Sequence, residues 1–346
     1  MSIKKIGILT GGGDCPGLNA VIRAVTKYSE LHNIEVIGFK DGWKGLLDKR
    51  YIDLNHKSVS GLIHKGGTIL GTSRTNALKD QETIDLVINN FSHLSLEALV
   101  VIGGEGTLTV GSEFHKLGLP IIGVPKTIDN DISKTDFTFG FDTAVSIATE
   151  AIDRLHTTAE SHNRIMIVEV MGRHAGWIAT YAGIAGGADA VLIPEFPLSV
   201  EEITKIIEKR KAAGKLFSII VVAEGAPIVE QQKQSFVHKK IKDDFGRPRL
   251  GGIAEQLAQK LEEKLNIECR VTVLGYVQRG GTPSAADRVL ATRYGHYAVD
   301  LVLKKKFGQM VCLNGTKLSS VNLKEATTSL KKVNKEIWDV AKTFFN

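Results

Sequence analysis

Short apolar runs alternate along the chain with longer segments in which apolar residues recur at helical spacing. The first run, residues 6–9, is followed by Leu18, Val21, Ile22 and Val25, whose spacing is that of one face of a helix. The same pattern predicts strands at 97–104, 120–124, 164–171, 189–195, 217–225 and 269–277, and a helix at 199–214. Because apolar strands are separated by helices, we predict an α/β protein with mainly parallel sheets covered on both faces.

Length and composition narrow the class of protein. At 346 residues the chain exceeds the usual size of a single core, so two lobes are expected. It has no apolar run of membrane length and no charged-then-apolar leader, which favours a cytoplasmic protein with no membrane partner. Cys15, Cys269 and Cys312 are isolated and are predicted to be reduced thiols.

Charge does not indicate a nucleic-acid partner. The net charge of +6 is spread along the chain without a long basic tract, and small anionic ligands explain it equally well. The stretch 239–249 is rich in charges of both signs and is interpreted as a solvated loop.

The strand at 6–9 ends in GGGDCPG. Gly11–Gly13 can adopt backbone conformations closed to other residues and allow a ligand to approach the main chain. Asp14 and Pro16 are typical of a helix start. Since a helix N-terminus presents unpaired N–H groups and the positive end of the helix dipole, this turn is predicted to bind phosphate.

A second glycine turn, GGEGT, follows the strand at 97–104. Here Glu105 lies between Gly104 and Gly106. A carboxylate in such a loop can hold Mg²⁺ directly or through water, and the ion would neutralise phosphates. A tight turn with an exposed acid is the alternative interpretation.

The stretch PKTIDND directly follows the strand at 120–124. Asp129 is a candidate base for a substrate hydroxyl, and Lys126 is a candidate ligand for phosphate oxygens. Asp129 and Asp131 are two residues apart, so they point the same way in an extended loop, where Asp131 can orient or coordinate. A loop built on Asx-type turns is the alternative.

Several arginines lie near predicted strand ends, where ligands of open parallel sheets gather. A guanidinium offers planar, multidentate hydrogen bonding to phosphate. Taken together they exceed what surface salt bridges alone lead us to expect: Arg74, Arg164, Arg173, Arg270 and Arg279.

Taken together, the motifs of the chain resemble those of one family. The stretches GGGDCPGLN, GGEGT, PKTIDND, VEVMGR, AEGA and GYVQRGG, in this order, are similar to the 6-phosphofructokinases over roughly residues 3–300. The chain has no Walker lysine loop, protein-kinase catalytic loop or GxGxxG turn. The resemblance implies two Rossmann-like three-layer α/β/α lobes. Residues 1–140 with about 278–330 would bind ATP and Mg²⁺, residues 141–277 would bind fructose 6-phosphate, and residues 331–346 would form a C-terminal helix.

The resemblance also implies a reaction and a set of residues. The γ-phosphoryl group of ATP would pass to the 1-hydroxyl of fructose 6-phosphate in glycolysis, giving fructose 1,6-bisphosphate and ADP. Catalysis would fall to Asp129, Asp131, Thr127 and Arg173, with Asp129 as the base. The donor and Mg²⁺ would be held by Gly11, Arg74, Thr75, Gly104, Glu105, Gly106 and Thr107, with Glu105 as the metal-binding carboxylate. The sugar phosphate would be held by Thr127, Asp129, Arg164, Met171, Gly172, Arg173, Glu224, Arg270, Tyr276 and Arg279.

Oligomerisation is part of the same expectation. In this family, residues at the positions of Arg164 and Arg270 reach in from a neighbouring subunit. A homotetramer with shared active sites is therefore implied, with a dimer as the alternative. Tyr276 stands where histidine is usual.

The family's bacterial effector site is only partly matched. Arg23 and Lys215 fit its basic positions, whereas His156 and Phe217 do not. We therefore expect an allosteric family member in which control by ADP and phosphoenolpyruvate is weak or absent.

The choice of phosphoryl donor depends mainly on Gly106 and Lys126. Glu105 in place of aspartate and Lys126 in place of glycine resemble a subgroup with both ATP and pyrophosphate users. Gly106 lies where pyrophosphate enzymes carry aspartate, and glycine leaves room for the α-phosphate of ATP. ATP is therefore the predicted donor. The alternatives are a pyrophosphate-dependent phosphotransferase and, in a different class, a catalytically silent nucleotide or sugar-phosphate sensor; a nicotinamide-dependent oxidoreductase would need a GxGxxG turn.

Overall fold

The computed structural model of the protein describes residues 3–230, 233–235, 238–242 and 248–345. The chain divides into two compact units. We call Met1–Ile128, Ile132–Thr143 and Arg279–Leu330 the first unit, and Asp129–Asp131, Ala144–Gln278 and Lys331–Asn346 the second unit. The predicted lobes differ from these units at two places, because Asp129–Asp131 and the C-terminal segment both belong to the second unit.

The first unit is built on a seven-stranded sheet in the order β15-β14-β5-β4-β1-β2-β3. Its five inner strands are parallel, and β3 and β15 are antiparallel edges. The strands are β1 (Lys5–Gly11), β2 (Glu35–Phe39), β3 (Tyr51–Leu54), β4 (Ala98–Gly103), β5 (Ile121–Pro125), β14 (Gln309–Asn314) and β15 (Lys317–Asn322). β4 is buried along its whole length, as expected of a strand covered on both faces.

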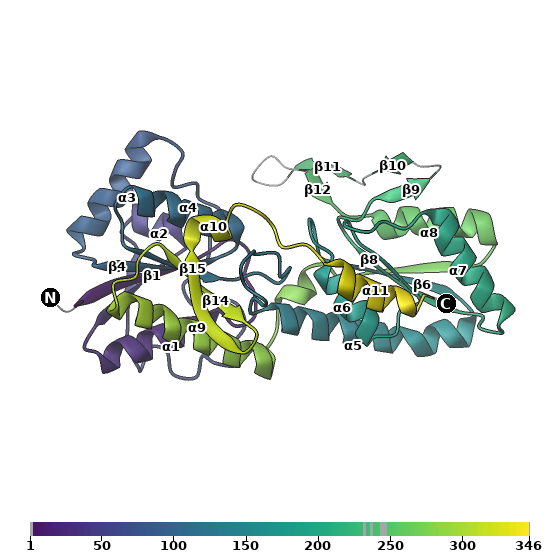
Figure 1. The fold of residues 1–346 in the computed structure, drawn as a ribbon, viewed down its shortest axis with the longest axis horizontal. Coiled ribbons are helices and arrows are strands. Elements are labelled where there is room, and N and C mark those ends of the chain that lie inside the picture. The colour runs from purple at the N-terminus through teal and green to yellow at the C-terminus, as the bar shows by residue number, and fades with distance from the viewer. Residues whose placement is uncertain (1–2, 231–232, 236–237, 243–247, 346) are drawn as a thin grey trace. The chain divides into compact units, whose positions relative to one another are not determined.

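Helices cover both faces of this sheet (Figure 1). One face is covered by α1 (Leu18–Leu31) and α9 (Ala285–Leu303). The other face carries α2 (Trp43–Leu47), α3 (Gln81–His93), α4 (Glu105–Lys116) and α10 (Leu323–Ala326). The second face forms a core in which Phe39 and Leu99 of the sheet lie with Trp43, Phe91 and Phe114 of the helices.

The second unit has a smaller, entirely parallel sheet in the order β13-β6-β8-β7. The strands are β6 (Ile165–Val170), β7 (Ala190–Leu192), β8 (Ser218–Ala223) and β13 (Cys269–Val273). In Figure 1, α7 (Val200–Ala212) and α8 (Ile253–Leu265) cover one face, and α5 (Phe141–His162), α6 (Trp177–Ala185) and α11 (Lys335–Thr343) lie on the other. The two sheets confirm the predicted fold class.

Several predicted boundaries differ from the observed ones; the strand predicted at 189–195, for example, spans only Ala190–Leu192. Helix α1 begins at Leu18, later than Asp14 and Pro16 suggested, because Gly17 adopts a left-handed conformation (φ 105°) against Phe139. The strand predicted at 269–277 ends at Val273, and the 3₁₀ helix η1 (Gly275–Arg279) follows.

The charged stretch 239–249 is not simply a loop. It overlaps β11 (His238–Lys242) and β12 (Pro248–Leu250), which pair antiparallel, while residues 243–247 lie outside the described residues. A second small pair is formed by β9 (Ile228–Glu230) and β10 (Lys233–Ser235).

Two further predictions concern thiols and membranes. All three cysteines lie in the described part of the chain, where each is buried and none is in a disulfide. Burial raises the pKa of Cys15 to about 12, which keeps it a thiol. Among the helices of the described residues, none has the length and apolar character needed to span a membrane.

Candidate active site

In the first unit, three predicted site loops begin side by side. Gly11 of β1 is the register partner of Gly103 of β4, and Gly103 is the partner of Pro125 of β5. The loops GGGD, GGEGT and PKTIDND therefore leave the same edge of the sheet from adjacent strands. The chain runs from β1 to β2 on one side and later to β4 on the other, so the first two loops flank the point where the strand order reverses. Ligands of doubly wound sheets bind at such points.

The glycines at these strand ends make room for Thr107. A Cβ at Gly11 would lie 2.6 Å, and one at Gly103 2.4 Å, from side-chain atoms of Thr107. Only glycine therefore fits at both positions. Gly104 is the N-cap of α4, and Glu105 is exposed in the first turn of that helix.

Gly106 is in a different situation. A Cβ built there meets nothing within 4 Å, and the residue has an ordinary helical backbone within α4. Neither packing nor conformation requires a glycine, although glycine in a helix costs about 0.5–1 kcal/mol relative to alanine.

Lys126 links the three loops. Its side chain is buried, its ammonium group donates a hydrogen bond to the Gly13 carbonyl, and its amide donates to the Gly103 carbonyl at 2.9 Å. The Thr127 carbonyl accepts a bond of 2.8 Å from the Thr138 hydroxyl. Lys126 and Thr127 are thus fixed beside the glycine turns.

Arg279 lies against the first glycine loop. A Cβ at Gly13 would lie 1.8 Å from Arg279 Nη1, which also approaches the Asp14 carbonyl at 3.4 Å. The structure therefore places Arg279 in the first unit with the donor-loop residues, whereas the other predicted sugar-phosphate arginines belong to the second unit.

The loop that carries Arg74 and Thr75 is attached to the same region. Thr10 Oγ1 donates to the Gly71 carbonyl at 2.8 Å, and Thr72 Oγ1 donates to the Gly12 carbonyl at 2.6 Å. These two bonds hold the loop against the end of β1, which places Arg74 and Thr75 near the glycine turn.

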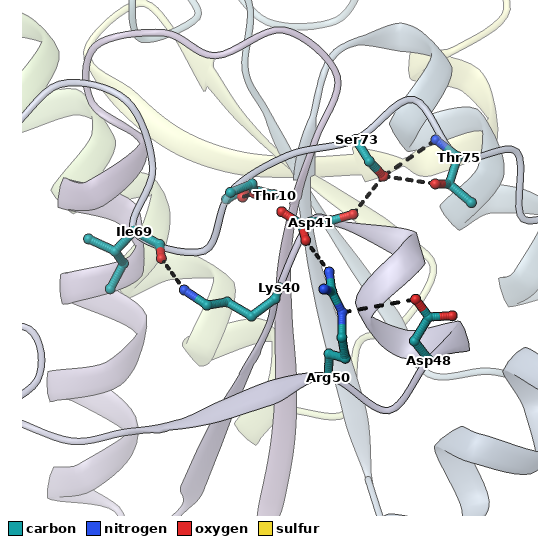
Figure 2. A network of polar contacts seen from close by, with 9 residues as sticks. Thr10, Lys40, Asp41, Asp48, Arg50, Ile69, Ser73 and Thr75 are labelled. Atoms are coloured by element: carbon teal, nitrogen blue, oxygen red, sulfur yellow. Dashed lines mark hydrogen bonds and ion pairs between the residues drawn. The ribbon is translucent and has the colours of Figure 1, made fainter.

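Figure 2 shows the network behind that loop. The Ser73 hydroxyl donates to the Asp41 carbonyl at 2.6 Å and lies 3.0 Å from the Thr75 hydroxyl. Asp41 has a left-handed backbone (φ 57°) and its carboxylate is paired with Arg50. No motif or spacing in the sequence indicates Asp41 or Ser73 as supports of Thr75.

In the second unit, the ends of β6 and β8 meet. Val170 and Ala223 are register partners, and the Glu224 amide donates to the Val170 carbonyl at 2.9 Å. Gly172 has a φ of 138°, which favours glycine, and its carbonyl accepts from the Gly225 amide at 3.1 Å. Met171, Gly172 and Arg173 therefore lie beside Glu224 at this end of the sheet.

Tyr276 lies on η1, which is fastened to this edge by Gln278. The Gln278 side chain is fully buried, donates to the Gly275 carbonyl at 3.1 Å and accepts from the Met171 amide at 3.3 Å. Tyr276 itself is 73% exposed. Gln278 belongs to the GYVQRGG motif, but nothing in the sequence pointed to this role.

Arg164 and Arg270 lie at the opposite edge of the same sheet. Arg164 precedes β6, and Arg270 is the second residue of β13, in register with Met166. Glu268 binds both, because Arg164 Nε donates to Glu268 Oε2 at 2.5 Å and Arg270 bonds to Oε1. The hydrogen bond from Arg164 holds the pKa of Glu268 below its ordinary value. Glu268 is a further residue that the sequence did not indicate.

The loop Asp129–Asp131 follows β5 and belongs to the second unit. Both aspartates are half-buried, and Asn130 between them is buried with a left-handed backbone (φ 50°). The loop is therefore not the extended segment predicted from the sequence, so simple alternation does not place the carboxylates of Asp129 and Asp131 on one side.

The two sheets, one mainly and one entirely parallel, and their loop-bearing ends define a doubly wound α/β protein, a class that binds ligands at strand ends. A family model described as phosphofructokinase matches residues 5–302, so the chain belongs to the phosphofructokinase family. The resemblance stated from the sequence motifs is confirmed.

Relatives with two different donors match almost equally well. The chain is 52% identical over 330 residues to "ATP-dependent 6-phosphofructokinase 3" of Streptomyces coelicolor, covering 95% of this chain and 96% of that protein. It is 51% identical over 343 residues to "Pyrophosphate--fructose 6-phosphate 1-phosphotransferase" of the same organism, covering 99% of each. A phosphofructokinase structure from Saccharomyces cerevisiae matches with a TM-score of 0.81 and 32% identity. The match covers 99% of this chain and 46% of the yeast chain, so this chain spans about half the length of the yeast chain.

Proposed function

We propose that the protein is an ATP-dependent 6-phosphofructokinase, which transfers the γ-phosphoryl group of ATP to the 1-hydroxyl of fructose 6-phosphate. The observation that carries this proposal is the register of Gly11, Gly103 and Pro125, from which three motif loops leave one sheet edge together. Both named Streptomyces relatives are, by their names, fructose 6-phosphate enzymes, so they favour the acceptor without choosing the donor.

In this proposal the first unit binds the donor. Gly104 is only partly buried at the N-terminus of α4, Thr107 lies in the first turn of that helix against Gly11, and Arg74 and Thr75 approach from the supported loop. The second unit binds the sugar phosphate through Met171, Gly172 and Glu224. Asp129 accepts the proton of the 1-hydroxyl, Arg173 stabilises the developing charge, and Thr127 and Asp131 orient the reacting groups.

Mg²⁺ fits as an ion shared between the protein and the donor. Glu105 is an exposed carboxylate in the first turn of α4, and the described residues contain no group of three His, Cys, Asp or Glu placed to hold a metal. Mg²⁺ is commonly held by one or two carboxylates together with substrate phosphates. Bound beside Glu105, the ion would supply charge neutralisation for the transferring group.

The choice of ATP rests on Gly106. The space over this residue is open, and a glycine there is explained by neither packing nor backbone conformation. An open position after Glu105 suits a nucleotide, whose α-phosphate and nucleoside must extend beyond the two phosphates that pyrophosphate also has. Lys126 would favour pyrophosphate if its ammonium bound the departing phosphate; the Gly13 carbonyl takes one of its three N–H donors, and a cation at this position does not exclude ATP. Pyrophosphate remains the second candidate donor because of the named relatives.

We further propose that the active site is shared in a homo-oligomer, with a tetramer ahead of a dimer. Arg164 and Met171 lie at opposite ends of β6, and seven residues of extended chain span about 23 Å at ~3.3 Å per residue. An arginine side chain cannot cover that distance. Arg164 and Arg270 therefore suit the sugar phosphate of a second copy rather than that of their own chain.

The cellular setting follows from this activity: we propose a cytoplasmic enzyme of glycolysis. The proposed allosteric control by family effectors is weak, because His156 is bonded to the Gly186 carbonyl at 2.7 Å and its ring packs edge-on against Phe217. These contacts leave a ring pair where the family has basic or more polar contacts.

The test is a coupled assay for fructose 1,6-bisphosphate, with fructose 6-phosphate, Mg²⁺ and either ATP or pyrophosphate. We expect much faster turnover with ATP. Product from pyrophosphate alone would establish the alternative donor. Binding of both ligands without product from either donor would favour the silent sensor, against which the presence of both Asp129 and Arg173 argues.

A further inference from the structure

The C-terminal segment crosses the loop that holds the proposed catalytic aspartates. Lys331 lies beyond the part of the chain that the family model matches, yet its amide donates to the Asp131 carbonyl at 2.8 Å. Its Nζ donates to the Asn130 side-chain oxygen at 2.9 Å. One residue therefore contacts two consecutive members of the loop Asp129–Asp131 within the second unit.

The C-terminal segment itself is fixed by bonds to α6 and to Glu195. The Trp177 indole nitrogen donates to the Lys331 carbonyl at 2.9 Å, and the Lys331 ammonium lies 5.3 Å from the centre of the Trp177 ring. Two residues further on, the Val333 amide donates to Glu195 Oε1 at 3.0 Å. Glu195 also accepts from the Gly176 amide, at the N-terminus of α6. Lys331 is thus bonded to Trp177 of α6 through its carbonyl, and to the loop Asp129–Asp131 through its amide and its ammonium group.

We call the contacts of Lys331 with Asn130 and Asp131 the clamp. Asn130 is the residue through which the clamp acts on the loop. Its side chain is 1% exposed, and its left-handed backbone sets the turn between Asp129 and Asp131. Asparagine tolerates that conformation better than most residues, but does not fix the side-chain direction by itself. The bond from Lys331 fixes the amide, and an ammonium donor makes a stronger bond than a neutral one.

We infer that Lys331 is a positioning residue for the catalytic loop: through Asn130 it holds the Asp129 carboxylate in the geometry needed for proton transfer. This inference rests on the proposed function of Asp129. It assigns a catalytic contribution to the C-terminal segment, which lies outside the matched family region. A misplacement of about 1 Å can cost ~10²-fold in rate, so the bond is expected to affect turnover more than binding.

The test variant is Lys331→Met, which keeps the length of the side chain and both backbone bonds while removing the ammonium. We expect kcat to fall ~10–100-fold, with KM for fructose 6-phosphate changed less than about threefold. Lys332→Met is the matched control, because Lys332 is the exposed neighbour. A Lys331→Met enzyme with the kcat of the Lys332→Met enzyme would overturn the inference.

A second pair of measurements identifies the route. Asn130→Gly keeps the left-handed backbone and removes the amide, so adding Lys331→Met to it should lower kcat no further; a full additional loss would show that Lys331 does not act through Asn130. Hydrogen exchange of residues 128–134 should also be faster in Lys331→Met than in Lys332→Met, and equal rates would contradict the clamp. If the unmodified protein fails to phosphorylate fructose 6-phosphate, the proposed function fails, while the exchange measurement still judges the clamp.

Discussion

Arg164 Nε lies 2.5 Å from Glu268 Oε2, and the other oxygen of that carboxylate binds Arg270. Two guanidinium groups from different strands thus converge at one point, at the edge of the sheet opposite to Met171. Arg164 is partly buried while Glu268 and Arg270 are exposed, and exposed ion pairs contribute little to stability. Glu268 therefore acts mainly by holding the two guanidinium groups together, at the place where the proposed sharing of the active site would put the sugar phosphate of a second copy.

The first prediction concerns the sharing of the active site by two chains. Either Arg164→Ala or Asp129→Asn alone should give a poorly active enzyme, the first through weak binding of the sugar phosphate and the second through loss of the base. In mixed oligomers, an Arg164→Ala chain supplies Asp129 and its neighbour supplies Arg164, so one intact site forms at such an interface. We expect activity to reappear when the two variants are unfolded and refolded together.

The experiment must also show that mixed oligomers have formed, for example by mass spectrometry with a mass tag on one variant. Each variant refolded alone is the control. Mixed oligomers with no more activity than the two controls would show that Arg164 serves its own chain or no site at all.

The second prediction concerns Asp129 as the base. The substitution Asp129→Asn keeps the shape of the side chain but removes its ability to accept a proton. General-base catalysis contributes about 10²–10⁴-fold, so kcat should fall by that factor or more, while fructose 6-phosphate still binds. Steady-state kinetics together with calorimetric binding of fructose 6-phosphate separate the two effects. A folded Asn variant with near-normal kcat would reject the assignment.

The third prediction concerns Asp287, a buried carboxyl at the start of α9. Burial raises its pKa from 3.8 to about 6, against the lowering effect of hydrogen bonds from the amide and hydroxyl of Thr143. Between pH 4 and 6 the unfolded chain has lost this proton and the folded chain retains it. The free energy of unfolding should therefore fall as the pH rises through this range, by up to about 3 kcal/mol from this group.

Asp287→Asn removes that titration and keeps an oxygen acceptor for Thr143. Denaturant unfolding of both proteins from pH 4 to 7 measures the difference, which should shift in favour of the variant as the pH rises. Parallel stability curves would mean that Asp287 titrates alike in the folded and unfolded chains.

The three strands that lead into the site loops of the first unit, β1, β4 and β5, could be predicted because each is a mainly apolar run that ends in glycine or proline. Local sequence did not reveal where the run at 269–277 turns into η1, since Gly275 has a left-handed backbone (φ 53°) and the apolar pattern continues through it. The start of α1 was missed for a similar reason. Gly17 has a left-handed backbone and lies so close to Phe139, which is distant in sequence, that a Cβ there would be 2.7 Å from its ring.

The candidate site likewise contains some residues that could be predicted from the sequence and others that could not. Glu105, Gly106, Asp129 and Asp131 stand in short motifs whose chemistry can be recognised without a structure. The residues that support them cannot be found in this way. Lys331 is 201 residues from Asn130, and Glu268 is 104 residues from Arg164. Such contacts depend on which strand ends and segments the fold brings together, and a single sequence carries no period or spacing that records them.

The last prediction concerns the phosphoryl donor and uses the open space over Gly106. A Cβ there meets nothing within 4 Å, so Gly106→Ala should fold and gain roughly 0.4–1 kcal/mol in the free energy of unfolding, with ATP turnover kept. Gly106→Asp should also fold, but its carboxylate would fill the path of the α-phosphate and repel it, so ATP turnover should be lost while fructose 6-phosphate still binds.

Gly106→Asn has the size of aspartate without its charge, so it separates the steric clash from the charge repulsion. An ATP turnover between those of the Ala and Asp variants would show that both contribute. Assays of all three variants and the unmodified protein with ATP and with pyrophosphate complete the comparison. If the unmodified protein works with pyrophosphate and not with ATP, or if Gly106→Asp uses ATP as well as Gly106→Ala does, the open position does not select the donor and Lys126 is the residue to test next.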